Sequence, residues 1–382
     1  MLPPPRRNSA TMNSLDKTVW RSYRVARKIV ESSVIASFEL VPTDGSIVLP
    51  YEPGQFLTFR ITPEDERSET RHYSLSGDPA DSTHYRVSVK REPAPANRPD
   101  LAPGRMSRLL HDQIRVGDEL IARGPEGKFV LDRPSSRPVV LLAGGIGATP
   151  LLAMAHSLCA EGIRKTWFIH GCDNREVQAF GSELRALAAR HDNLNVHVLY
   201  RVAGVNDVPG VHHDSEGLVT RALLQRLLPL DDYDFYLCGP TPFIQNVYDI
   251  LGSLGVQDNR IAYEFFGPAT LVKQTRTPVP EQAIVRPQYP QSVDTTGADN
   301  LVVFAKSGFS APWTADCDSM LEFAEGQGLE PSFSCRVGIC NTCSCEILEG
   351  EVEYHMEPLN PPAENMALLC CCRPRGRVSV AL

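Results

Sequence analysis

Seven of the eleven cysteines in this 382-residue chain lie between Cys335 and Cys372. Cys335, Cys340 and Cys343 have the spacing C-x4-C-x2-C, and Cys370 follows 27 residues later. This spacing is typical of a 2Fe-2S cluster, because one tight loop supplies three thiolates and a distant strand supplies the fourth. Gly338 would let the loop backbone approach the inorganic sulfides and donate N–H groups. The pattern therefore predicts an iron-sulfur centre with Cys370 as a candidate fourth ligand.

Other uses of these thiols are favoured less. Zinc usually takes paired C-x2-C knuckles, and only the pair Cys340 and Cys343 is present. A redox dithiol would precede a helix, whereas residues 344–354 after that pair have a strand pattern. Cys345 is expected to pack as a buried thiol along this strand. The run from Cys370 to Cys372 leaves open which of the three is the ligand.

Composition excludes several classes of protein. A formal charge of -8 provides no basic footprint for nucleic acid or anionic lipid, and 42% hydrophobic with 22% charged residues is typical of a soluble globular protein. Residues 1–19 lack the apolar core of a signal peptide and are interpreted as a disordered tail, which favours a cytoplasmic setting. Residues 139–160 are apolar and long enough for a membrane span, but three glycines and a proline interrupt them. We expect a strand, a glycine turn and a helix there.

Three groups of elements must position the chemistry. Short alternating strands over 20–134 predict an antiparallel barrel. Buried strands alternate with helices over 135–268 and predict a doubly wound parallel sheet. Residues 269–299, rich in Pro, Gln and Thr, are interpreted as a linker. Residues 300–382 contain an opening strand, a helix around Ser319 to Glu325 and the cysteine loop, so the length suits three domains in series.

A strand segment and a turn within the first group have anion-binding chemistry, although either feature alone would equally suit ordinary barrel surface. In RHYSLS, residues 71–76, Arg71 can bind an anion through two hydrogen bonds, Tyr73 offers a stacking surface and Ser74 a hydroxyl. Gly104 and Ser107 bound a turn that can approach a phosphate. In this order the residues resemble the flavin domain of the ferredoxin reductase superfamily, especially the reductase modules of flavohaemoglobins.

The resemblance implies an FAD-binding Greek-key barrel. Arg71 would hold the pyrophosphate, Tyr73 would stack on the isoalloxazine and Ser74 would lie by its N5. The turn G-x-M-S favours FAD over FMN. The pocket would be completed by Phe56, His72, Val89, Lys90, Gly104, Met106 and Ser107.

The segment AGGIGATP, residues 143–150, follows a strand and opens a helix, so its N–H groups and the helix dipole suit a pyrophosphate. A simple packing turn is the alternative from this loop alone. The family resemblance extends to YLCGPTPF and YEFFGP, and it implies that Ser74, Cys238 and Glu264 line the hydride-transfer site as catalytic, positioning groups. The nucleotide and flavin contacts would come from Gly144, Gly145, Gly147, Thr149, Pro150, Cys238, Gly239, Pro240, Phe265 and Phe266.

The residues that follow the next expected strand predict the choice between NADH and NADPH. Asp173 is available for a ribose hydroxyl, and Arg175 for a 2'-phosphate. Because Arg175 is a lone cation, NADH is preferred, with NADPH as the alternative.

The closing segment LLCCCRP resembles the end of the ferredoxin-like domain of bacterial oxygenase reductases, with Cys370 as ligand, and implies a C-terminal β-grasp domain. Asn341 stands where that family usually has Gly, although Asn tolerates a left-handed backbone. The resemblance implies a monomeric reductase that passes electrons from NADH through FAD and a 2Fe-2S cluster to an external protein. The expected acceptor is a Rieske-type or other terminal oxygenase. A redox sensor, a non-catalytic electron-transfer scaffold and a partner of a molybdenum-cofactor (MOSC-like) protein are the alternatives.

Overall fold

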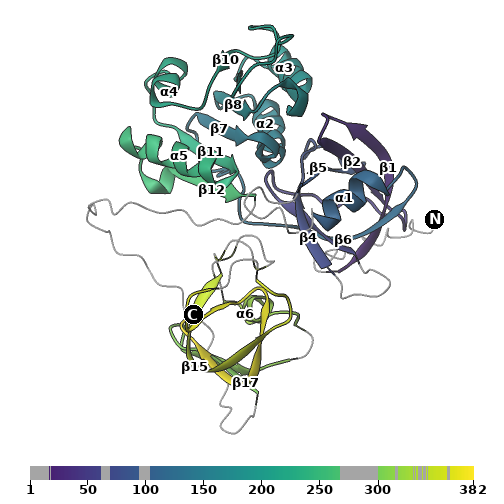
Figure 1. The fold of residues 1–382 in the computed structure, drawn as a ribbon, viewed down its shortest axis with the longest axis vertical. Helices are drawn as coiled ribbons and strands as arrows, with labels where there is room; N and C mark the ends of the chain where they lie inside the picture. The colour runs from purple at the N-terminus through teal and green to yellow at the C-terminus, as the bar shows by residue number, and fades with distance from the viewer. Residues whose placement is uncertain are drawn as a thin grey trace, which may run out of the picture.

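The computed structural model forms three sheets, one for each expected domain (Figure 1). It describes residues 17, 19–61, 69–93, 104–266, 300–314, 317–329, 331, 333, 338, 341, 343–358 and 362–382. The expected linker and nearly all of the expected tail lie outside these residues. Among the helices that are described, none combines the length and the apolar character needed to cross a membrane.

The first domain is an antiparallel six-stranded barrel in the strand order β4-β3-β6-β1-β2-β5. Its elements are β1 (Arg21–Val30), β2 (Ile35–Pro42), β3 (Phe56–Ile61), β4 (Glu69–Ser74), β5 (Tyr85–Lys90), α1 (Arg105–Asp112) and β6 (Glu119–Glu126). Alternating side chains such as Tyr23, Val25 and Phe38 fill the core, as the period of a strand requires. Lys28 Nζ donates to the carbonyls of Leu110, His111 and Ile114 at 2.7–3.0 Å, and so holds the carboxyl end of α1 on the barrel.

The second domain is a parallel sheet in the order β10-β9-β8-β7-β11-β12. Its elements are β7 (Val139–Gly144), η1 (Gly145–Gly147), α2 (Ala148–Glu161), β8 (Thr166–Cys172), η2 (Arg175–Val177), α3 (Gly181–Arg190), β9 (Leu194–Tyr200), β10 (Ser215–Glu216), α4 (Arg221–Leu227), β11 (Asp234–Gly239), α5 (Thr241–Ser253), η3 (Asp258–Arg260) and β12 (Ile261–Phe265). α2 and α3 pack on one face, and α4 and α5 on the other. The doubly wound prediction is confirmed, and residues 139–160 form a strand, a glycine turn and a helix.

A partly buried ion pair joins these two domains. Both guanidinium Nη atoms of Arg86 on β5 donate to the carboxylate of Glu183 on α3, each at 2.9 Å. His156 Nε2 on α2 lies 2.8 Å from Glu183 Oε1. Burial by itself would raise the pKa of Glu183, but hydrogen bonds from His156 and Arg86 outweigh it and lower that pKa to about 2. The barrel is therefore fixed to the helices that carry the glycine loop.

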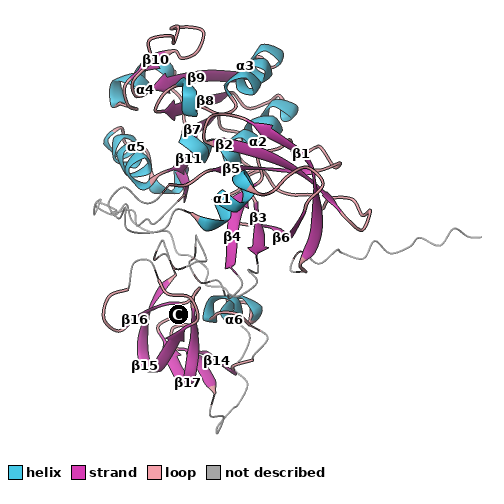
Figure 2. Ribbon diagram, turned by 45° about the vertical axis from the view of Figure 1, so that its right-hand side comes forward, coloured by secondary structure: helices cyan, strands magenta, loops and turns pink. Residues whose placement is uncertain are grey.

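The third domain has the sheet order β14-β13-β17-β15-β16 with one helix packed on it (Figure 2). Its elements are β13 (Leu301–Phe304), β14 (Phe309–Pro312), α6 (Met320–Gly326), β15 (Ser344–Tyr354), β16 (Met366–Leu368) and β17 (Cys372–Val380). β13 and β17 are parallel while their other pairings are antiparallel, as in a β-grasp domain. α6 begins after Ser319, whose Oγ accepts from Glu322 N, and the expected helix is confirmed.

Candidate active site

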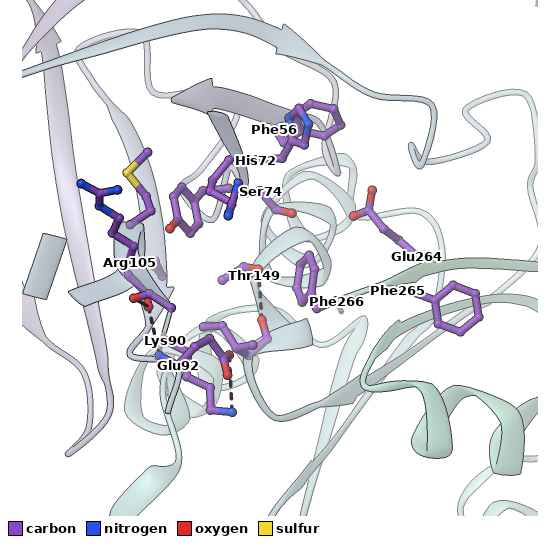
Figure 3. A pocket seen from close by; sticks show the side chains of 17 residues that line it. Phe56, His72, Ser74, Lys90, Glu92, Arg105, Thr149, Glu264, Phe265 and Phe266 are labelled. Carbon is purple, nitrogen blue, oxygen red and sulfur yellow. Dashed lines mark hydrogen bonds and ion pairs between the residues drawn. The ribbon is translucent and has the colours of Figure 1, made fainter. Parts of the chain in front are cut away.

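A cavity of about 250 Å³ lies between the barrel and the nucleotide domain. Most of the predicted flavin residues line it, together with residues from the end of β12 (Figure 3). The lining residues are Phe56, Arg71, His72, Tyr73, Ser74, Ser88, Lys90, Glu92, Gly104, Arg105, Met106, Ser107, Ile146, Thr149, Glu264, Phe265 and Phe266. Of these, Ser88, Glu92, Arg105 and Ile146 were not predicted. The strand period would have placed Ser88 beside Lys90, because both lie on the same face of β5.

Strands β3 and β4, with Ser88 and Lys90 of β5, form the barrel wall of the cavity. Phe56 and Ser74 are opposite each other in the antiparallel register, and both are buried. Phe56 also contacts the ring of His72 edge-on at 4.6 Å, and Thr58 Oγ1 lies 2.9 Å from His72 Nδ1. Burial raises the pKa of Tyr73, which keeps this phenol neutral and its ring a flat apolar surface. These residues fit one edge of a planar heterocycle.

A second wall is the amino end of α1. Gly104 caps the helix without a side-chain hydrogen bond, and no acidic residue lies in the first turn. Ser107 Oγ donates to Gly104 O at 2.9 Å and accepts from Glu92 N at 3.1 Å, so its hydroxyl holds the turn together. The backbone N–H groups of this first turn and the positive end of the helix dipole fit an anion such as a pyrophosphate.

Glu264 is the most perturbed group at the cavity. Its Oε2 is buried and has no hydrogen-bond partner among the described residues, and burial raises its pKa to about 8. Figure 3 places the Phe266 ring between Thr149 and Glu264, whereas Phe265 points away and contacts Tyr263 at 5.4 Å. The neutral carboxyl thus has an oxygen at the cavity wall without a partner, and a polar atom of a bound ring could form the missing hydrogen bond.

The glycine loop follows β7 and contacts the end of β11. A Cβ on Gly147 would lie 2.2 Å from the Cys238 carbonyl oxygen, and one on Gly239 would lie 2.9 Å from the Gly144 Cα. These glycines therefore allow two loops to approach closely. Gly145 differs, since it has φ +54° and no described atom lies within 4 Å of its would-be Cβ. Gly147 and Gly239 thus fit the explanation of this loop as a packing turn, whereas Gly145 fits the explanation as an anion-binding turn.

His170 on β8 contacts the glycine loop and was not predicted. Its Nε2 lies 3.0 Å from Gly145 O and 3.2 Å from Cys172 Sγ. The side chain is fully buried, and burial lowers its pKa to about 4. A neutral imidazole thus orients the Gly145 carbonyl, and the position of His170 beside Ala143 in the parallel register could have indicated this contact.

One predicted flavin residue, Val89, and one predicted catalytic residue, Cys238, do not line the cavity. Val89 alternates with the lining residues Ser88 and Lys90, so its side chain faces the barrel core. Cys238 is fully buried in the nucleotide-domain core, and burial and the neighbouring Glu264 raise the pKa of its thiol. It lies opposite Glu264 in the β11–β12 register. Cys238 therefore acts on the site through packing in this structure.

The remaining predicted nucleotide residues lie around the glycine loop. Pro150 is buried in the first turn of α2, and the Pro240 ring lies beside Gly144. Asp173 Oδ1 accepts from Arg201 Nε at 2.8 Å, with both side chains largely exposed. Arg201 was not predicted, and it pairs with the residue that was expected to bind the ribose hydroxyl. The preference for NADH stays a prediction.

The cluster loop is described in part. Cys335 and Cys340 lie outside the described residues, while Cys343 and Cys370 are both buried. Gly338, with φ +69°, donates its N–H to Cys370 Sγ at 3.3 Å. Asn341 has φ +55°, so it adopts the left-handed backbone that glycine would have provided.

The neighbouring thiols make other contacts. Cys371 Sγ lies 3.5 Å from Leu368 O and donates to it. Cys372 is fully buried, and Cys345 is nearly so. A backbone N–H directed at the sulfur of Cys370 is the kind of contact that stabilises a cluster thiolate, so the residues that are described fit a 2Fe-2S centre with Cys370 as a ligand.

Comparisons with known proteins cover all three domains. Family models match residues 22–131 as an oxidoreductase FAD-binding domain, 141–249 as an oxidoreductase NAD-binding domain and 306–375 as a 2Fe-2S iron-sulfur cluster binding domain. A flavohemoprotein of Chromobacterium violaceum is 41% identical over 249 residues, 65% of this chain and 61% of that protein. The chain thus spans about three-fifths of the length of such relatives.

Solved structures extend the comparison. The flavohem-like FAD/NAD binding domain of nitric oxide dioxygenase from Vibrio cholerae is 38% identical, with a TM-score of 0.57, over 65% of this chain and 99% of that one. Phthalate dioxygenase reductase matches 95% of this chain and 98% of its own at 24% identity and a TM-score of 0.56, which shows a common fold. The chain belongs to the ferredoxin reductase superfamily, as an FAD- and NAD-dependent oxidoreductase with a C-terminal 2Fe-2S domain.

Proposed function

We propose that this protein takes electrons from NADH and delivers them singly to an external redox protein, with a terminal oxygenase of the Rieske type as the favoured acceptor. The observation that carries the proposal is the cavity shared by barrel residues and by nucleotide-domain residues that follow β7 or lie at the end of β12. Such a cavity allows a flavin and a nicotinamide to meet. When bound, FAD accepts two electrons together from NADH, and a 2Fe-2S cluster passes them on one at a time.

The residues of the chain would orient these groups. Tyr73 and Phe266 provide apolar ring faces at the cavity, and Ser74 and Glu264 provide polar groups at its wall. Because the pKa of Glu264 is about 8, its carboxyl holds a proton at neutral pH and can donate a hydrogen bond. The amino end of α1 and the Gly145 turn would hold the two pyrophosphates.

The charge of the third domain bears on the acceptor. Residues 300–382 contain eleven Asp or Glu against five Lys or Arg, a net charge of -6 out of -8 for the whole chain. Complementary charge accelerates the encounter of two proteins. The acceptor would therefore present a basic surface to this domain. Phthalate dioxygenase reductase, which has the same fold, is a modular structure for electron transfer from pyridine nucleotides to [2Fe-2S].

Anaerobic mixing with NADH tests the proposal. We expect the flavin absorbance to bleach first and the iron-sulfur absorbance to follow, within seconds. NADPH should bleach the flavin more slowly at the same concentration. Absence of bleaching with either nucleotide in protein that contains both cofactors would refute an enzymatic role and favour a sensor or scaffold. A purified oxygenase component then tests the acceptor, and no reoxidation of the cluster by it would exclude that partner.

A further inference from the structure

Among the described residues, an ion pair and a cation–ring contact join the third domain to the barrel. Arg123 Nη1 on β6 lies 3.4 Å from Glu322 Oε1 on α6. Lys128 Nζ lies 5.7 Å from the centre of the Phe333 ring, two residues before Cys335. Figure 2 shows α6 below the ends of β3, β4 and β6. We call these four residues the docking contact.

Each partner of the ion pair is held in place by its own domain. The Arg123 guanidinium lies 5.2 Å from the Trp20 ring, and its Nε lies 3.3 Å from Glu126 Oε1. Glu322 Oε2 accepts from Asp318 N at 2.9 Å, which leaves Oε1 facing Arg123. Two groups that are already oriented lose less side-chain entropy when they pair than two freely rotating ones.

Hydrogen bonds join the helix of the docking contact to the segment that carries the expected cluster ligand Cys370. The amino end of α6 is tied to the closing segment, because Leu321 N donates to Leu369 O at 2.8 Å, next to Cys370. Arg373 on the other side of the cysteine run donates to Asp318 O at 3.0 Å. A displacement of Glu322 would therefore also move the segment that carries Cys370.

On the barrel side, the docking contact lies close to the cavity wall. Arg123 is opposite Thr58 in the β3–β6 register, and Thr58 Oγ1 contacts His72, which lines the cavity. We propose that Arg123 and Glu322, with Lys128 and Phe333, dock the 2Fe-2S domain on the barrel in the orientation that passes electrons from flavin to cluster. This proposal rests on the proposed function. It makes Arg123 and Glu322 positioning residues whose ion pair is weakened by salt.

A double-mutant cycle tests this proposal in the full-length protein with both cofactors bound. Arg123→Gln and Glu322→Gln remove one charge each, and the double variant removes both. Because a partly exposed ion pair is disrupted, we expect each single variant to slow the flavin-to-cluster step about two- to fivefold, and the double variant to be no slower than either. Flavin reduction by NADH should stay at the wild-type rate. Arg133→Ala is the matched control, since it removes an arginine that pairs with Glu52 and Glu161 elsewhere.

Small-angle X-ray scattering provides a readout independent of electron transfer. The wild type should expand between low and high salt, whereas both single variants should already be expanded at low salt. Iron and sulfide content confirms that the cluster is intact in each variant. Wild-type transfer rates and wild-type scattering in Arg123→Gln and Glu322→Gln, or additive effects in the double variant, would overturn the docking role. If NADH fails to reduce the flavin of the wild type, the proposed function fails, while the scattering comparison still decides the docking contact.

Discussion

Glu183→Gln should destabilise the association of the barrel with the nucleotide domain. Glu183 has an ordinary pKa of 4.5, which its hydrogen bonds lower to about 2. At 1.36 kcal/mol for each tenfold change in the proton-binding constant, this lowering of the pKa corresponds to about 3 kcal/mol. Because the side chain is 27% exposed, solvent screening reduces the expected loss to about 2 kcal/mol. Gln also leaves the Arg86 guanidinium, 13% exposed, without its counter-charge.

The pH dependence follows from the direction of the shift. A carboxyl whose pKa is lower in the folded state stabilises the protein fully above its unfolded pKa, near 4.5. This stabilisation is lost as the pH falls from about 4.5 toward 2, where the folded carboxyl also takes up a proton. The wild-type advantage over Glu183→Gln should therefore be constant from pH 8 to pH 5.5 and shrink below pH 4.5.

Thermal unfolding followed by circular dichroism and by flavin release measures this effect. About 2 kcal/mol corresponds to a decrease in Tm of about 4–8 °C for a unit of this size. Glu161→Gln is the control, because it removes a carboxylate from the exposed pair with Arg133 and should change Tm by less than about 2 °C. A Tm within 1 °C of wild type for Glu183→Gln at pH 7, or a difference that does not shrink on acidification, would refute the reasoning.

Three further predictions concern the site. In the wild type, the rate of flavin reduction by NADH should fall above about pH 8 as Glu264 ionises, because a buried negative charge disfavours the delivery of electrons. In stopped-flow measurements from pH 6 to pH 9.5, the rate for Glu264→Gln should not change with pH. Gly147→Ala places a Cβ 2.2 Å from the Cys238 carbonyl oxygen, so the loop must move. We expect at least a tenfold rise in the KM for NADH, and an unchanged KM would contradict the close approach of the loops. Cys370→Ser should lose the cluster and Cys372→Ser should keep it, and normal iron and sulfide content in purified Cys370→Ser would show that another thiolate is the ligand.

Local chemistry explains which parts of the structure were predictable. The period of apolar residues identified the barrel and the parallel sheet, because alternation and buried runs reflect how many faces of a strand are covered. The strand β1 was not singled out, since its four arginine and lysine residues mask the alternation of Tyr23 and Val25. The left-handed backbone at Asn341 is one that Asn tolerates better than most residues, in a position where the resembling family usually has Gly.

The sequence by itself determined the three kinds of domain, the cysteine spacing and the turns that approach phosphates, because each depends on residues close together in the chain. Only the tertiary structure decided which side chains meet. It turned Val89 and Cys238 away from the cavity and brought Glu264 to its wall, 190 positions after Ser74. It also paired Arg86 with Glu183 and Arg123 with Glu322 across domain boundaries. Such pairings depend on how domains pack: the pattern of residues along one strand or helix indicates which of its faces is covered, but not which residues of another domain lie against it.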